Sequence, residues 1–81
     1  MVRRIEVEVF PVERDRWIAV IEDPPGAFST EALTPDDVER VARKAIAEVL
    51  GWIEGEIVHV DDLGSAWSPS RAAEQADRLL R

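Results

Sequence analysis

The sequence contains no cysteine and only one histidine, His59. Without cysteine the chain has no disulfide bonds, no thiolate metal sites and no cysteine nucleophile. A single histidine cannot build a histidine-rich zinc site, and the sequence supplies neither a nucleophile nor an orienting partner for it. His59 shares a strand face with Ile57, so we interpret it as a partly buried structural residue. We therefore expect no enzymatic activity, no metal site and no cofactor.

Long hydrophobic runs are also absent. No apolar stretch approaches the roughly 18 residues that indicate a membrane-spanning helix. The first residues, Met-Val-Arg-Arg-Ile, lead directly into alternating charged residues, which is unlike a secretory signal peptide. We expect a cytoplasmic protein with no membrane partner.

Positive charge is scarce relative to negative charge. The 81 residues include 10 lysines and arginines and 17 acidic residues, which gives a formal net charge of −7. An acidic field repels phosphate backbones and anionic lipids, so a basic protein is a more suitable partner than nucleic acid or a membrane. The length fits one domain, and a hydrophobic content of 46% is typical of a folded chain.

Three segments in the first half of the chain have the pattern of β-strands. Apolar residues alternate with glutamates in residues 3–10, which is the period of a strand with one solvent-facing side. Residues 17–22 form a second strand and residues 27–32 a shorter third one. Pro11 ends the first strand or marks a sheet edge. The short turns between these segments predict an antiparallel three-stranded meander.

The second strand carries apolar side chains on both faces. Trp17, Ala19 and Ile21 lie on one side, and Ile18 and Val20 lie on the other. Such a strand is usually covered twice, here by a helix on one face and by a partner subunit or the C-terminal tail on the other. An exposed apolar sheet face is an association site, so we predict at least a homodimer.

One long helix follows the third strand. Thr34 is a suitable N-cap, Pro35 occupies the first helical position and Gly51 ends the helix. Apolar residues between these ends repeat with the period of an amphipathic helix. The side chains expected in the core against the first or the second strand are Val38, Val41, Ala45, Ile46 and Val49.

The rest of the chain reads as a strand, a linker and a short helix. Residues 56–60 form a fourth strand, which lies parallel to a strand of the meander because a helix precedes it. Residues 61–65 are a linker, and a second helix starts after Ser68 and runs to Leu80 with a thin apolar stripe. The sequence thus predicts an α+β fold in the order β-β-β-α-β, followed by a short C-terminal helix.

Four sequence stretches with this spacing resemble the HicB-like antitoxin family. Three carry the resemblance, namely Arg16–Asp23, Pro25–Thr30 and the helix residues Thr34–Val38 with Ala42–Ile46, and the fourth, Glu56–Val60, fits it. They correspond to the family's aromatic-led second strand, its Pro-Gly turn with the third strand, its helix start and body, and its closing strand. The chain departs from the common pattern at Ala27, at Ala32 and at the Asp37-Val38 pair.

The resemblance implies a partial RNase H-like fold, with an antitoxin domain in residues 1–60 and a linker and short helix in residues 61–81. It also implies a two-component toxin–antitoxin system, in which the antitoxin binds and blocks a small basic mRNA-interferase toxin. Family members commonly add a C-terminal DNA-binding module. The tail here has room for one helix and a net charge of −1 (three arginines against four acidic residues), so we expect no tight DNA binding by the chain alone.

The residues expected at an interface with another chain are Trp17, Ile18, Val20, Trp67, Leu79 and Leu80. Trp67 has two open interpretations: it packs back onto the sheet, or it docks on another chain. An alternative function is that of an orphan HicB-like domain, acting as a homo-oligomeric scaffold or a small-ligand binder without a toxin. A metal-dependent nuclease would need clustered carboxylates at one strand end, whereas Glu6 and Glu8 alternate with apolar residues and read as a solvent-facing strand surface.

Overall fold

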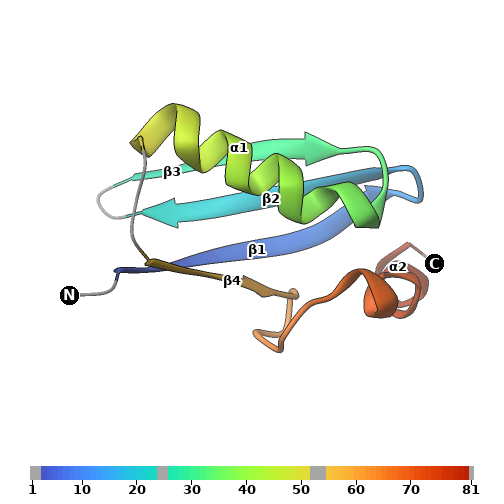
Figure 1. The fold of residues 1–81 in the computed structure, drawn as a ribbon. Helices are drawn as coiled ribbons and strands as arrows, with labels where there is room; N and C mark the ends of the chain where they lie inside the picture. The colour runs from blue at the N-terminus through green and yellow to red at the C-terminus, as the bar shows by residue number, and fades with distance from the viewer. Residues whose placement is uncertain (1–2, 24–25, 52–54, 81) are drawn as a thin grey trace.

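The computed structural model describes residues 3–23, 26–51 and 55–80. Its elements, in chain order, are β1 (Arg3–Glu13), β2 (Arg16–Asp23), β3 (Gly26–Ala32), a 3₁₀ turn (Pro35–Asp37), α1 (Val38–Leu50), β4 (Gly55–Val60), a second 3₁₀ turn (Pro69–Arg71) and α2 (Ala72–Leu79). Figure 1 shows a single sheet with α1 lying across it and α2 at one end. The fold is α+β, with the element order that the sequence predicts.

The sheet is mixed, with strand order β3-β2-β1-β4. β1 pairs with β2 and β2 with β3 in antiparallel fashion, so the predicted meander is confirmed. β4 pairs with β1 in parallel, and α1 supplies the crossover that such a pairing needs. In this register, Val7 lies opposite Ile21 on β2 and opposite His59 on β4.

β1 continues through Pro11, which was expected to end the strand or mark an edge. Pro11 pairs with Trp17, and the register shifts between Pro11 and Glu13. The pairing of β4 with β1 stops at Glu8 and Val60, so this end of β1 has a strand neighbour on one side only. A strand accepts proline at such an edge position, because the missing N–H is not needed for a second ladder. The edge interpretation therefore holds, and the strand does not end at the proline.

The core lies between α1 and one face of the sheet. Because Val7 lies opposite Ile21, the apolar residues of β1 and β2 share this face. α1 lies against β2 and β3, and its buried side chains belong to the same core as the apolar residues of β1 and β2. The buried side chains of the helix are Val38, Ala42 and Ile46. Val49 was expected in the core and is 60% exposed. The buried side chains lie four residues apart, from Val38 toward Leu50, and this spacing leaves Val49 on the exposed side of the last turn.

The ends of α1 follow the sequence in part. Thr34 is extended at the cap position and Pro35 begins the 3₁₀ turn, but the Thr34 side chain makes no capping hydrogen bond. Asp37 instead pairs with Arg40, one turn further on, at 3.4 Å. Gly51 ends the helix with a φ of 74°, a conformation that residues with a Cβ rarely adopt.

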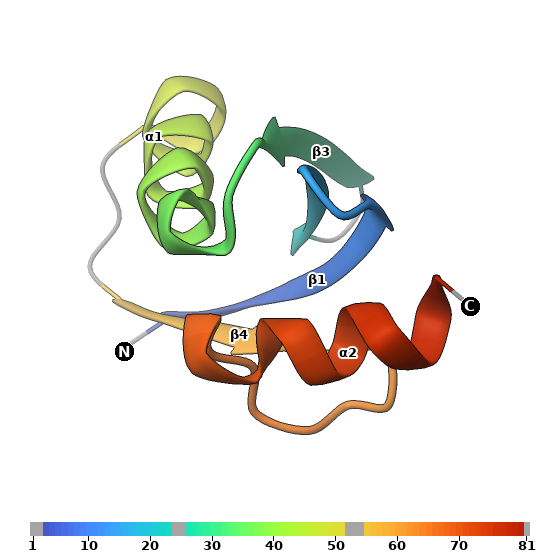
Figure 2. The ribbon, with the colours of Figure 1, turned by 90° about the vertical axis from the view of Figure 1, so that its right-hand side faces the viewer.

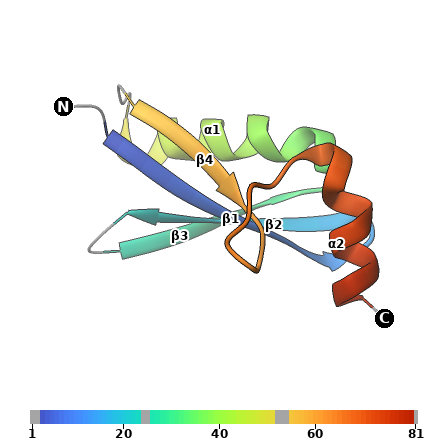
Figure 3. The ribbon, with the colours of Figure 1, turned by 90° about the horizontal axis from the view of Figure 1, so that it is seen from below.

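The C-terminal tail joins the same core as residues 3–60. Trp67, Ala72 and Ala76 are buried with the apolar residues of β1 and β2. α2 packs against β1, beyond the point where β4 ends (Figures 2 and 3). Within the described parts of the chain, neither helix has the length and apolar surface needed to cross a bilayer.

Candidate functional site: the open face of the sheet

The sheet face opposite α1 has an apolar centre. The register places Phe10 opposite Ile18, and Val20 opposite Glu8, so these side chains share one side of β1 and β2. Phe10, Ile18, Val20 and Val58 are half-buried on this side. In Figure 2, α1 lies on one side of β2 and β3, and no helix of the described residues lies on the other side. We call this surface the open face.

Carboxylates surround and interrupt this apolar centre. By register and strand period, the acidic side chains on the open face are Glu6, Glu8, Glu22, Glu31 and Glu56; Glu8 is half-buried and the other four are exposed. The basic side chains on the same face are Arg4 and Arg16, and Arg16 pairs with Glu31 at 3.0 Å. The open face therefore carries more negative than positive charge.

Glu6 and Glu22 lie directly opposite each other on neighbouring strands. Like charges in a cross-strand pair destabilise the pairing, so a nearby cation would relieve this repulsion. Nothing in the local sequence of either strand reveals the pair, because it depends on the register between β1 and β2. The described residues contain no group of three or more His, Asp or Glu side chains arranged to hold a metal ion.

The structure separates the six residues expected at an interface. Ile18 and Val20 lie on the open face, as their alternation with Trp17 indicated. Leu79 is 42% exposed on α2. Leu80, which directly follows α2, is partly buried against the core. Trp17 and Trp67 need correction: they are 2% and 6% exposed, so a partner could not reach them in this conformation.

Trp67 follows the first of its two interpretations and packs back onto the sheet. Its ring centroid lies 6.1 Å from that of Trp17, at an interplanar angle of 56°, and 6.3 Å from that of His59. Its backbone N–H donates to the carbonyl oxygen of His59 at 2.9 Å. The tail is thereby fixed to the end of β4, and Trp67 closes the core at that end.

His59 is half-buried beside Trp67, in agreement with its interpretation as a structural residue. Its Nε2 atom is buried and has no hydrogen-bond partner among the described residues. Burial lowers the pKa of the imidazole below 6.5; Glu39 opposes this change and Arg43 adds to it. Burial therefore favours the neutral form of the ring.

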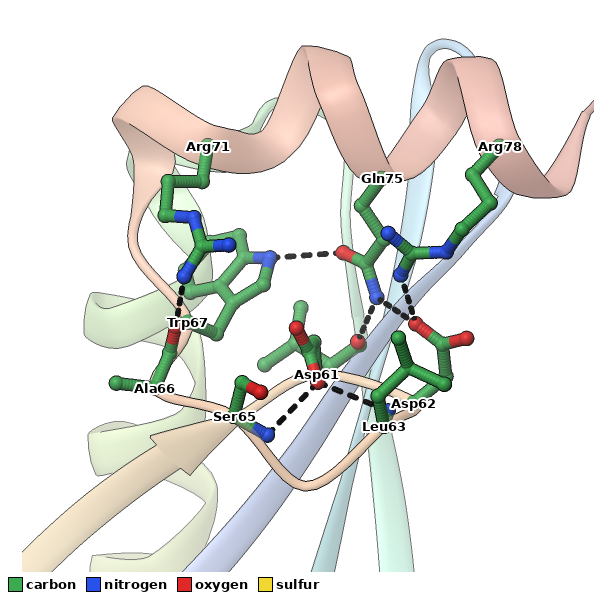
Figure 4. A network of polar contacts seen from close by, with 10 residues as sticks. Asp61, Asp62, Leu63, Ser65, Ala66, Trp67, Arg71, Gln75 and Arg78 are labelled. Carbon is green, nitrogen blue, oxygen red and sulfur yellow. Dashed lines mark hydrogen bonds and ion pairs between the residues drawn. The ribbon is translucent and has the colours of Figure 1, made fainter.

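Gln75 is a site residue that sequence reasoning missed. Its Oε1 accepts a hydrogen bond from Trp67 Nε1 at 2.9 Å, and its Nε2 donates to the carbonyl oxygen of Val9 at 2.7 Å (Figure 4). Nε2 also lies 3.2 Å from Asp62 Oδ1, which accepts a hydrogen bond from Arg78 at 2.5 Å. The available signal was a glutamine three residues after Ala72, on the apolar stripe of the predicted helix.

Residues 61–65 were expected to be a linker and instead form a tight turn. Asp61 Oδ1 accepts hydrogen bonds from the backbone N–H groups of Leu63 and Ser65 at 2.8 and 2.9 Å. A bridge between Val60 and Ala66 closes the turn. Asp at the first position of a turn commonly binds the backbone in this way.

Asp62, which follows in the same turn, connects it to α2. Partial burial raises the pKa of its carboxyl, but hydrogen bonds from Arg78 and Gln75 outweigh this effect and lower the pKa overall. A cavity of about 10 Å³ lies beside this network, lined by residues that include Trp67 and Arg71, and it has room for one water molecule. That volume does not support binding of an organic ligand at this position.

Comparisons of the chain with protein-family models, with curated proteins and with solved structures gave no match. The resemblance to HicB-like antitoxins and the partial RNase H-like fold that it implies therefore stay predictions.

Proposed function

We propose that this chain is a non-enzymatic binding protein of the cytoplasm that neutralises a small basic protein by covering its functional surface. The observation that carries the proposal is the open face, an apolar centre bordered by carboxylates on a sheet side that no described helix covers. The resemblance to HicB-like antitoxins supports the same mode of action. In that family the neutralised partner is an mRNA interferase.

The chemistry of the open face fits a cationic partner. Protein interfaces typically combine an apolar centre with a polar rim, and complementary rim charges speed association and select the partner. A protein that cleaves RNA needs a cationic surface to hold phosphates, and this surface matches a face on which carboxylates outnumber arginines. Occupation of that surface by the open face would exclude RNA without any catalytic step by this chain.

The test starts from the gene next to the one for this chain, which should encode a small basic protein, and continues with co-expression of the two. The basic protein alone is expected to arrest growth, and co-expression of the intact chain is expected to restore it. Glu22→Lys places a positive charge on the open face opposite Glu6, where it forms a favourable cross-strand pair, so the fold tolerates it. This variant should bind the basic protein about tenfold or more weakly in titration calorimetry.

The matched control is Glu48→Lys, which changes the net charge equally at an exposed position on α1. It is expected to bind and to restore growth as the unchanged chain does. Equal weakening by both variants would mean that net charge rather than the open face drives binding. Absence of any binding to a basic neighbour would favour the orphan scaffold.

A further inference from the structure

The two edges of the sheet differ in whether their outer backbone groups have hydrogen-bond partners. At the β4 side, Val60 forms a bridge with Ala66, and the Trp67 N–H donates to the His59 carbonyl. Beyond the end of β4, Gln75 binds the free carbonyl of Val9. The tail thus satisfies polar backbone groups at the C-terminal end of this edge, and such cover is a common way to prevent unwanted strand pairing.

The β3 edge has no such protection. β3 pairs with β2 at all seven of its residues, from Gly26 to Ala32, and shows no register shift that would twist it away from a neighbour. It contains neither proline nor lysine. Its one charged side chain, Glu31, is paired with Arg16. Among the described residues nothing pairs with the outer side of β3, and a regular edge of this kind is a template for another strand.

We propose that β3 pairs with β3 of a second copy of this chain, antiparallel about a two-fold axis, so that two sheets join into one. Opposed residues in an antiparallel pair point to the same face of a sheet. An axis perpendicular to the sheet must therefore set one residue of β3 opposite its own counterpart. The register in which all seven residues overlap is the one centred on Ser29.

This register makes β3 complementary to itself. It sets Phe28 opposite Thr30 of the second copy on the α1 side, and Ala27 opposite Glu31 of the second copy on the open-face side. No like charges oppose each other, and the half-buried Phe28 gains a neighbour. Small domains bury a low share of their surface, so an added strand on each copy also extends the core. Both open faces then lie on the same side of the joined sheet, which leaves them accessible; the proposal does not depend on the basic partner.

Ser29 is exposed and provides the test, since the axis sets it opposite itself. In sedimentation equilibrium at micromolar concentration, the full chain should have twice its mass of 9.1 kDa. Ser29→Lys and Ser29→Glu should each shift the protein to the monomer, because each sets two like charges side by side. An equimolar mixture of the two variants should restore the dimer, since the opposed charges then attract. Circular dichroism checks that each variant folds.

Ser70→Lys is the matched control, an exposed position on the tail, and it should stay dimeric. A monomeric unchanged chain would overturn the proposal. Dimers of both Ser29 variants would place the interface elsewhere, and a mixture that stays monomeric would show that Ser29 is not at the axis. These measurements need no basic partner, so their failure is distinct from a failure of the proposed function.

Discussion

Gln75 Nε2 donates a buried hydrogen bond of 2.7 Å to the carbonyl oxygen of Val9, a residue 66 positions earlier in the chain. A side-chain amide here does what the backbone of a neighbouring strand would do, since it satisfies a carbonyl that β4 does not reach. The same amide accepts the indole N–H of Trp67. One residue thus links the tail, the core and the edge of β1.

Replacement of Gln75 by leucine should therefore destabilise the fold. The buried carbonyl of Val9 and the indole N–H of Trp67 would lose their partners, and each unsatisfied buried group costs about 1–3 kcal/mol. We expect a total loss of about 2–5 kcal/mol, measured by urea unfolding followed by tryptophan fluorescence. Glu74→Leu, an exposed neighbour, is the control and should change stability by less than about 0.5 kcal/mol. A small effect of Gln75→Leu would show that water replaces the amide.

The face of α1 that packs on the sheet can be tested with two truncations. Ile46 is 2% exposed, and Ile46→Ala should cost about 2–5 kcal/mol because it leaves a cavity under the helix. Val49 is 60% exposed, and Val49→Ala should cost less than about 0.5 kcal/mol. Urea unfolding of both variants measures the difference. Comparable losses at the two positions would mean that the last turn of α1 packs more closely than described.

Stability should fall on mild acidification because of His59. Burial lowers the pKa of this imidazole in the folded chain, so below pH 6.5 the unfolded chain binds more protons than the folded one. The stabilising contribution of the neutral ring is complete above pH 6.5 and is lost as the pH falls through the lowered folded pKa. Glu39 and Arg43 on α1 are the charged groups that act on the ring, while its partner on β1 is the apolar Val7.

The measurement is the free energy of unfolding in urea at pH 7.5, 6.5 and 5.5, for the unchanged chain and for His59→Gln. The difference between the two proteins should decrease as the pH falls, since only the unchanged chain takes up a proton at this position. A constant difference across the three pH values would contradict the prediction. Asp62, whose pKa is also lowered, loses its contribution only below pH 3.8 and does not interfere in this range.

The main elements of the fold could be predicted because their signals are local. The alternating residues predict the strand β1, and Thr34 and Gly51 mark the two ends of α1. The helix before β4 indicates that this strand pairs in parallel within the sheet. Half of the open face was predictable for the same reason, since Ile18 and Val20 alternate with Trp17 along one strand. The acidic border was not, because the opposition of Glu6 and Glu22 depends on the pairing register.

The tail was the least predictable part, because its role depends on which residues of the sheet it packs against. Trp67 could be assigned to the core or to a partner until its neighbours Trp17 and His59 were located. Asp61 looked like part of a linker, although its carboxylate orders the turn that returns the chain to the sheet. Residues of this kind gain their function from contacts that are distant in sequence.

The last prediction concerns DNA: the chain alone should not bind it tightly. The arginines of α2 and of the turn before it are the tail's candidates for phosphate contacts, and they already have partners. Arg71 donates to the Ala66 carbonyl at 3.3 Å, and Arg78 binds Asp62. Asp77 adds negative charge to the same helix and pairs with Arg14 of the β1–β2 turn at 2.7 Å. DNA readers need a cationic surface with an element presented to a groove, and the described arginines of the tail supply no such surface.

Fluorescence anisotropy with the promoter fragment upstream of its own gene, at about 150 mM salt, is the test of that prediction, since specific binders reach roughly 10⁻⁸ M under such conditions. We expect no sequence-dependent binding below about 1 μM for the isolated protein. Asp62→Asn and Asp77→Asn supply a comparison, because they release arginines and reduce the negative charge of the tail. The affinity of these variants for DNA should increase only slightly, and this binding should weaken with salt and be the same for any DNA sequence. Sub-micromolar binding by the unchanged chain that is specific for its promoter would show instead that the dimer assembles a DNA-reading surface from two tails.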